Sequence, residues 1–294
     1  MNEFRVGVVG IGAMGEPMAL ALRRAGFEVN ACAHRNMAPL ERLAAAGVHK
    51  ASDPSDVAAK SDVVITMLPD APQVEEAIFS ERGLLAGVEK LTYFIDMSTI
   101  SPLASRRFGE RLRTCGHRFI DAPVSGGPVR AKEGTLTLMV GADPSDFTHV
   151  ALVLRAMGVP YHVGGVSMGE TVKLVNQLLI ANIMLANAEA LTFAKKSGAD
   201  VGVVREVIAS ATGSNYILEK WLPKTWFAGS FEGGFALDLL RKDLAAALDA
   251  ARMLVLPLPA SSLSYQIYTA ASADGNGRRD YSVIAKLYER FAAQ

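Results

Sequence analysis

The chain begins with a short apolar segment that runs directly into three glycines at a fixed spacing. The segment Arg5–Val9 is followed by Gly10-x-Gly12-x-x-Gly15 and then by a helical pattern that starts near Glu16. In a strand–turn–helix unit, these glycines permit a sharp turn, a close approach of backbone to a pyrophosphate, and tight packing of the helix on the strand. The helix N-terminus adds N–H groups and a positive dipole end, which favour phosphate. A glycine-rich turn without a ligand is the alternative, but the flanking strand and helix favour dinucleotide binding.

The first half of the chain alternates short apolar segments with helical patterns. The expected strands are Arg5–Val9, Glu28–Ala33, Val63–Leu68 and Thr92–Asp96. Several of the expected helices carry a proline in the first turn, where its missing N–H costs nothing; they are Pro17–Ala25, Pro39–Ala46, Pro54–Lys60, Pro72–Phe79 and Pro102–Cys115. Short strands that alternate with helices predict a parallel, doubly wound sheet. A second group follows, with strands at Arg118–Asp121, Leu136–Gly141 and Pro160–Val163 and a helix from Pro144 to Met157.

Beyond Gly164-Gly165 the pattern becomes entirely helical. The expected helices are Val166–Ser197, Val201–Ala211, Ile217–Leu222, Leu237–Leu254, Pro259–Asp274 and Tyr281–Ala293. The first of them is apolar nearly all round, which implies burial on both sides, either as a spine between domains or at a subunit interface. We therefore predict a Rossmann-type α/β domain over residues 1–164, then an all-α domain over residues 165–294 with a long interdomain helix at its start.

Composition narrows the class of protein. Thirty basic residues balance thirty acidic ones, which gives no sign of affinity for nucleic acid or an anionic membrane. Polar residues interrupt the apolar stretch Leu174–Ala194, so we interpret it as a helix of a soluble protein. Cys32 and Cys115 are too few for a disulfide framework and suit the cytoplasm. The five histidines show no metal-binding spacing, so no metal site is predicted.

The end of the second expected strand bears on the choice between the two nicotinamide cofactors. An acidic residue there accepts from the ribose 2′-hydroxyl, whereas a basic residue binds a 2′-phosphate. This chain has His34, Arg35 and Asn36 at that point and no carboxylate. Arg35 can hold the phosphate in a charge-assisted pair, so NADP(H) is favoured. If Arg35 instead stacks on adenine in a solvated loop, NAD(H) is equally compatible.

The segment Asp121-Ala-Pro-Val-Ser-Gly-Gly127 reads as a strand end followed by a tight loop. Two glycines after Ser125 leave backbone N–H groups accessible, and the serine adds a hydroxyl. Together they form a small nest for an anion such as a carboxylate. The alternative is an ordinary loop in which Gly126 and Gly127 only supply a positive φ.

Lys173 precedes an apolar stretch of the long helix and shares a face with Asn176 and Gln177. A helical lysine is most often solvated, but this helix is expected to be buried. A buried amine needs partners or a lowered pKa, and an amine with a pKa near neutral can exchange a proton with a hydroxyl. Lys242-Asp243 begins an alanine-rich segment and is, from the residues alone, an exposed charge pair.

Four segments resemble the β-hydroxyacid dehydrogenase family, which includes 3-hydroxyisobutyrate dehydrogenases and tartronate semialdehyde reductases. They are Gly7-Val-Val-Gly-Ile-Gly-Ala-Met-Gly15, Asp121-Ala-Pro-Val-Ser-Gly-Gly127, Gly169-Glu-Thr-Val-Lys-Leu-Val-Asn176 and Lys242-Asp243, and they cover nearly the whole chain in the family's order. The resemblance implies that Lys173 is the catalytic acid and base and that Asn176 orients the hydroxyl or the amine. The family often has a second asparagine where this chain has Gln177.

The resemblance also implies the binding residues. The substrate carboxylate is expected on Ser125, Gly126 and Gly127, and Lys242 is expected to reach both cofactor and substrate. The remaining cofactor contacts expected from the glycine loop and from the family are Gly10, Ile11, Gly12, Ala13, Met14, Gly15, His34, Arg35, Asn36, Leu68, Pro69, Gln73 and Thr99. Several of these lie after expected strands, at the edge where an α/β sheet binds its ligand.

The expected function is hydride transfer between NADP(H), or NAD(H), and a small 3-hydroxy acid or its semialdehyde. Imine reductases have a similar fold but usually lack a lysine at the position of Lys173; a non-catalytic dinucleotide-binding protein is the rival from another class. Asn215 and Tyr216, between two expected helices, either line the pocket or cap the next helix. The apolar long helix predicts a homodimer or homotetramer.

Overall fold

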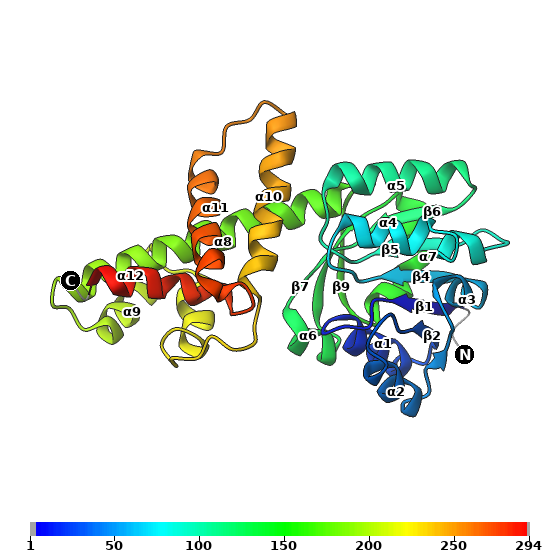
Figure 1. Ribbon diagram of the computed structural model, residues 1–294, viewed down its shortest axis with the longest axis horizontal. Helices are drawn as coiled ribbons and strands as arrows, with labels where there is room; N and C mark the ends of the chain where they lie inside the picture. The colour runs from blue at the N-terminus through cyan, green and yellow to red at the C-terminus, as the bar shows by residue number, and fades with distance from the viewer. Residues whose placement is uncertain (1–3, 293–294) are drawn as a thin grey trace. The chain divides into compact units, whose positions relative to one another are not determined.

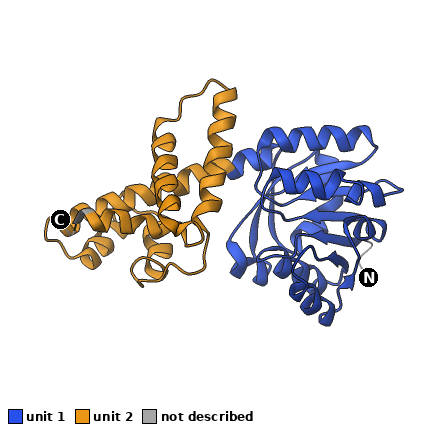
Figure 2. Cartoon of the chain, in the orientation of Figure 1, with its two compact units in different colours: residues 1–173 blue, residues 174–294 orange. Residues whose placement is uncertain are grey.

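The computed structural model describes residues 4–292, with the side chains up to Arg290. The chain divides into two compact units, residues 1–173 and residues 174–294 (Figure 2). The sequence predicts a domain boundary after residue 164. The division lies a little further along the chain, inside one continuous helix, α8 (Met168–Lys196), which starts in unit 1 and continues into unit 2.

In the part of the chain that the structure describes, nine strands form one sheet in unit 1 (Figure 1). They are β1 (Arg5–Val9), β2 (Glu28–Cys32), β3 (His49–Lys50), β4 (Val63–Thr66), β5 (Tyr93–Asp96), β6 (Arg118–Asp121), β7 (Val124–Ser125), β8 (Leu136–Gly141) and β9 (Gly158–Gly164). The order β3-β2-β1-β4-β5-β6 is parallel throughout and is the strand order of dinucleotide-binding sheets. The predicted Rossmann-type fold is confirmed.

The other end of the sheet is mixed. Strand β8 runs antiparallel to β6 and β7 and parallel to β9. Strands β3 and β7 were not predicted, because a two-residue strand has no alternation to detect. Helix α6 (Gly127–Glu133) was not predicted either, and it begins where only a loop was expected.

Helices cover both faces of the sheet, as a doubly wound topology requires. In unit 1 the further helices are α1 (Gly15–Arg24), α2 (Ala38–Ala45), α3 (Pro54–Ala59), α4 (Ala71–Phe79), α5 (Pro102–Thr114) and α7 (Pro144–Arg155), with a 3-10 turn at Leu84–Gly87. Along β4, Val63 and Ile65 pack with α1, α2 and α7, whereas Val64 packs with α3, α4 and α5. This alternation places one apolar core on each face of the sheet.

The named secondary-structure elements in the described part of unit 2 are all helices, and one isolated β-bridge joins Ala236 to Asp280. After α8 come α9 (Val201–Ala209), α10 (Leu237–Met253), α11 (Pro259–Ala271) and α12 (Ala285–Ala292), together with short π or 3-10 turns at Ile217–Trp221, Leu222–Lys224, Ser272–Asn276 and Tyr281–Ile284. The expected helix Pro259–Asp274 ends at Ala271 as an α-helix. A π-helical turn follows, and within it Gly275 has a φ of 84°, which a helix does not allow. The expected helix Tyr281–Ala293 begins as a 3-10 turn, and its last residue lies outside the described range.

Helix α8 is less buried than its apolar sequence predicts. Val175, Leu179 and Phe193 are exposed, so one side of α8 is not buried within the single chain, and burial of that side at a subunit interface stays a prediction. The opposite side, which includes Ala181, Met184 and Ala188, packs in the core of unit 2. By length and composition alone α8 could also cross a membrane, and 44% of its most apolar window is buried.

Candidate active site

The glycine loop has the geometry that dinucleotide binding requires. Gly10 has a φ of 96°, and a Cβ there would collide with the carbonyl of Met67 at the end of β4. A Cβ on Gly15 would collide with the carbonyl of Gly10, so this glycine lets α1 start tightly against the strand. Both positions are glycines because of the fold itself.

Gly12 differs from the other two glycines. It is exposed, its φ lies outside the left-handed range, and nothing stands within 4 Å of the position that a Cβ would occupy. The space over the loop is open where a backbone-to-pyrophosphate approach needs it, so these residues fit a dinucleotide. Ala13 is exposed beside it, whereas Ile11 is buried and Met14 half-buried.

Glu16 places a carboxylate in the first turn of α1, where an anionic ligand is expected. Its two oxygens accept from Nε and Nη2 of Arg42 on α2, at 2.6 and 2.7 Å. The hydrogen bond from Arg42 lowers the pKa of Glu16, so the carboxylate stays ionised. The ion pair balances a negative charge that would otherwise oppose a bound phosphate.

The loop after β2 is exposed at His34, Arg35 and Asn36. The Asn36 Oδ1 accepts from the backbone N–H of Ala38, which ties the loop to the start of α2. No hydrogen bond or ion pair joins the Arg35 guanidinium to another residue in the range 4–292. The structure therefore leaves this positive charge accessible at the carboxyl end of β2.

Buried polar contacts link the loops after β4 and β5. The hydroxyls of Thr66 and Ser98 donate to Asp96 Oδ1 at 2.8 and 2.6 Å. Ser98 Oγ in turn accepts from the N–H of Leu68, at 2.9 Å. This network fixes the backbone around the expected cofactor contacts Leu68 and Thr99, which are half-buried, whereas Pro69 and Gln73 are exposed.

Asp121 anchors the start of α8 at the end of β6. Its two carboxylate oxygens accept from the N–H groups of Ser167 and Glu170, at 2.6 and 2.8 Å. Gly141 and Gly169 pack so closely around it that a Cβ on either would meet the carboxylate at 2.5 and 2.8 Å. Burial raises the pKa of Asp121 to about 7 against these hydrogen bonds, and the neighbouring Asp96 adds to the rise.

This anchor determines where Lys173 lies. Lys173 is one turn beyond Glu170 on α8 and is 8% exposed. Its Nζ donates to the carbonyl oxygen of Val124 at 2.8 Å. Val124 immediately precedes Ser125, so the amine lies beside the segment that was expected to bind a carboxylate. Sequence analysis predicted both features, and the structure brings them together within unit 1.

The Ser125-Gly126-Gly127 segment is a turn with a positive φ at both glycines. The φ angles of Gly126 and Gly127 are 134° and 68°, which other residues rarely adopt. The turn connects β7 to α6, and Ser125 and Gly127 are half-buried while Gly126 is exposed. The hydroxyl and the N–H groups of this turn are donors of the kind that a small carboxylate needs, and carboxylate binding here stays a prediction.

In unit 2, a buried carboxylate organises the residues that follow Lys173. The Gln177 Nε2 donates to Asp243 Oδ2 at 2.7 Å, and the Asn176 Nδ2 donates to Gln177 Oε1 at 2.9 Å. Lys242 pairs with Asp243 at 3.0 Å. Asp243 is 2% exposed, so the pair is not the exposed one that the residues alone suggest, and the role that the resemblance implies for Lys242 stays a prediction. The Lys242-Asp243 pair was recognised from the sequence, but its position inside α10 (Leu237–Met253) and the contact of Asp243 with Gln177 were not predicted.

Asn215 caps a helical turn. Its Oδ1 accepts from the N–H of Leu218 at 2.9 Å, and its amide exchanges hydrogen bonds with Asn187. Of the two interpretations left open, the structure shows the cap. Tyr216 is exposed beside it.

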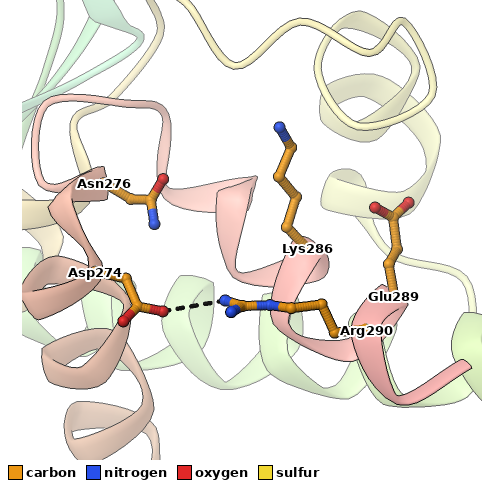
Figure 3. A pocket seen from close by; sticks show the side chains of 5 residues that line it. All are labelled: Asp274, Asn276, Lys286, Glu289 and Arg290. Carbon is orange, nitrogen blue, oxygen red and sulfur yellow. Dashed lines mark hydrogen bonds and ion pairs between the residues drawn. The ribbon is translucent and has the colours of Figure 1, made fainter. Parts of the chain in front are cut away.

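The hollow shown in Figure 3 lies elsewhere in unit 2 and contains none of the expected site residues. It measures about 530 Å³, is open to solvent, and is lined by Asp274, Asn276, Lys286, Glu289 and Arg290. Its Arg290–Asp274 ion pair spans 3.0 Å. Within the described residues there is also no group of three or more His, Cys, Asp or Glu side chains that could hold a metal ion.

Two family models match the chain almost end to end. Residues 5–169 match the NAD-binding domain of 6-phosphogluconate dehydrogenase, and residues 167–288 match the NAD-binding domain of NADP-dependent 3-hydroxyisobutyrate dehydrogenase. Each match covers most of one structural unit.

Individual relatives and solved structures point the same way. The chain is 37% identical to 2-(hydroxymethyl)glutarate dehydrogenase of Eubacterium barkeri, covering 98% of this chain and 96% of that one. It is 36% identical to 2-hydroxy-3-oxopropionate reductase of Escherichia coli, covering 98% of both. The solved 3-hydroxyisobutyrate dehydrogenase of Mycobacterium tuberculosis with L-serine superposes with a TM-score of 0.90 at 31% identity, covering 97% of this chain and 98% of that one. An imine reductase of Myxococcus stipitatus, at 15% identity and a TM-score of 0.67, shares the fold alone.

Proposed function

The chain belongs to the β-hydroxyacid dehydrogenase family of NAD(P)-dependent oxidoreductases, and we propose that it interconverts a small 3-hydroxy acid and the matching semialdehyde with Lys173 as the proton-transferring group. One observation carries the proposal. The Lys173 amine is buried and lies 2.8 Å from the Val124 carbonyl, directly beside the Ser125-Gly126-Gly127 nest. A carboxylate on the nest would therefore bring a nearby hydroxyl to the amine.

Each residue of the proposed site has a separate role. Ser125 and the N–H groups of Gly126 and Gly127 hold the carboxylate and orient the substrate. When bound, the nicotinamide accepts or supplies the hydride. Lys173, as a neutral amine, takes the hydroxyl proton while the C–H bond of the same carbon gives up its hydride; in the reverse direction its ammonium form protonates the carbonyl oxygen. Asn176, one turn along α8, is proposed to orient that oxygen.

The substrate class is defined by a carboxylate and a hydroxymethyl or aldehyde carbon. The relatives' names give candidate substrates of this kind: 2-(hydroxymethyl)glutarate, 2-hydroxy-3-oxopropionate and 3-hydroxyisobutyrate. Absorbance of the reduced nicotinamide, followed with each compound and with both cofactors, tests the proposal. We expect turnover with at least one of them. Binding of cofactor without turnover of any hydroxy acid or semialdehyde would instead favour a non-catalytic dinucleotide-binding protein.

We propose NADP(H) as the preferred cofactor because Arg35 leaves an accessible positive charge at the end of β2. Arg35→Asp should raise the dissociation constant for NADPH about ten-fold or more, as the loss of a charged hydrogen bond of ~1.5–3 kcal/mol implies. Titration of NADPH by fluorescence measures it. The affinity for NADH should change less, because NADH has no 2′-phosphate and therefore no such hydrogen bond to lose.

Arg113→Asp is the matched control for this substitution. Arg113 is an exposed arginine of α5, and its replacement changes the net charge equally without altering the β2 loop. We expect the NADPH affinity of this variant to stay within about two-fold of the parent, since distant surface charges are screened. Equal affinity of the unmodified protein for NADPH and NADH would overturn the preference.

We also propose that unit 2 binds a second copy of the chain. Besides the exposed side of α8, the end of α10 and the turn after it expose Met253, Leu254, Val255 and Leu256. Val255 is 90% exposed and has a φ of 55°, a strained conformation for a β-branched residue. An apolar surface of this kind on a protein in water marks a contact with another molecule.

Light scattering of the protein in detergent-free buffer tests the assembly. We expect the mass of two or four chains, and a smaller mass for Leu254→Asp, which places a charge in the apolar turn. Val255→Gly is the control, because it keeps the turn and relieves the strain while leaving Leu254 in place. A monomeric parent protein, or one that sediments with neutral lipid vesicles, contradicts the proposal.

A further inference from the structure

Arg130 lies against the carboxylate nest. It is on α6, the helix that begins at Gly127, and its side chain folds back over Gly126. A Cβ on Gly126 would meet Cβ and Cδ of Arg130 at 2.8 Å and its Nε at 3.2 Å. The aliphatic part of the arginine therefore occupies the side of Gly126 that a larger residue would need, and the start of the guanidinium lies next to the nest.

No residue of the described range neutralises this guanidinium. The Arg130 side chain makes no hydrogen bond or ion pair with another residue in the range 4–292; its contact with Thr135 involves the backbone carbonyl, which accepts from that residue. The nearest acidic residue along α6, Glu133, accepts instead from the hydroxyl of Thr135, at 3.3 Å. The arginine is exposed and so keeps a full positive charge in reach of a ligand.

We propose that Arg130 selects substrates with a second anionic group, so that the preferred 3-hydroxy acid is a dicarboxylate. This inference rests on the proposed function of the nest. In that function the serine hydroxyl and the two glycine N–H groups bind one carboxylate, and the Lys173 amine, which donates to the Val124 carbonyl beside the nest, serves the hydroxyl. The guanidinium is then an additional donor, and its planar shape matches a second carboxylate in a bidentate pair.

Two acids of the proposed class allow the effect of the second carboxylate to be measured. 3-Hydroxyisobutyrate and 2-(hydroxymethyl)glutarate share the carboxylate and the hydroxymethyl group, and the second replaces a methyl hydrogen by a carboxymethyl group. For the unmodified protein we expect a higher kcat/KM with the dicarboxylate. Arg130→Gln should lower kcat/KM for the dicarboxylate ~10- to 100-fold, the effect of one charge-assisted hydrogen bond, and lower that for the monocarboxylate by less than about three-fold. Arg130→Lys should retain part of the preference.

Lys132→Gln is the matched control. Lys132 is an exposed cation of the same helix, two residues on, so it points away from Arg130's side of the helix. It removes the same charge and should leave the ratio of the two kcat/KM values unchanged. An equal loss with both acids would assign Arg130 to the first carboxylate, and no loss would remove it from the site; either result overturns the inference.

Binding separates this inference from the proposed function. If the unmodified protein oxidises neither acid, the proposed function fails, and calorimetry of each acid with the NADP⁺-loaded protein then decides on Arg130. Tighter binding of 2-(hydroxymethyl)glutarate that is lost in Arg130→Gln supports the selection of a second anion. Equal binding of the two acids, or equal binding by both proteins, contradicts it.

Discussion

Lys173→Ala is expected to lower turnover ~10²- to 10⁴-fold, the usual contribution of a positioned acid or base. The amine is held beside the nest by a 2.8 Å hydrogen bond to the Val124 carbonyl and is almost fully buried. Water that fills the space left by alanine is a poorer proton carrier and has no fixed position. The dissociation constant for NADPH should change by less than about three-fold, because the expected cofactor contacts lie on other elements.

Lys195→Ala controls for the loss of a lysine from the same helix. Lys195 is exposed in the last turn of α8, so its removal should leave turnover and the unfolding temperature unchanged. Lys173→Arg keeps the charge but cannot release a proton near neutral pH, and should be nearly as slow as the alanine variant. Near-full activity in Lys173→Ala would remove this residue from the mechanism.

Gly12→Ala is expected to weaken cofactor binding ~10- to 100-fold while the protein stays folded. Nothing in the protein stands within 4 Å of the added methyl group, and the backbone there tolerates an alanine. A pyrophosphate bound to the loop would meet that methyl group and lose hydrogen bonds worth ~1.5–3 kcal/mol. The dissociation constants for NADPH and NADH, with the unfolding temperature measured beside them, give the result.

Two further glycine variants calibrate this prediction. Gly165→Ala also adds a methyl group to an exposed, open position, and should change neither stability nor cofactor affinity. Gly15→Ala should destabilise the fold itself, because its Cβ would collide with the Gly10 carbonyl. Unchanged cofactor affinity in Gly12→Ala would mean that no ligand approaches the loop at this point.

The sequence predicted the doubly wound half of the fold because its signals are local. Apolar runs such as Arg5–Val9 and first-turn prolines such as Pro54 and Pro102 define their elements without help from distant residues. The antiparallel pairing of β8 depends instead on contacts between distant segments. Helix α6 was missed because Gly126 and Gly127 indicate a turn, and the helix after them has only seven residues.

In the candidate site, too, the residues with a local sequence signal were predicted and the contacts between distant residues were not. Residue types and the family resemblance were enough to select Lys173 and Ser125, but not to show that Val124 joins them. Arg130 carried no sequence signal, because an arginine three residues after a glycine pair is unremarkable until the helix folds it back over Gly126. The burial of Asp243 likewise depends on packing within unit 2, which charge alone does not predict.

A crystal structure with NADP⁺ and a 3-hydroxy acid tests the central claim most directly. We predict the substrate carboxylate on Ser125, Gly126 and Gly127, the Lys173 Nζ within ~2.6–3.2 Å of the hydroxyl oxygen, and the carbon bearing that hydroxyl facing the nicotinamide C4. The account would be contradicted if the Lys173 amine still bound only the Val124 carbonyl and a different side chain contacted the substrate hydroxyl.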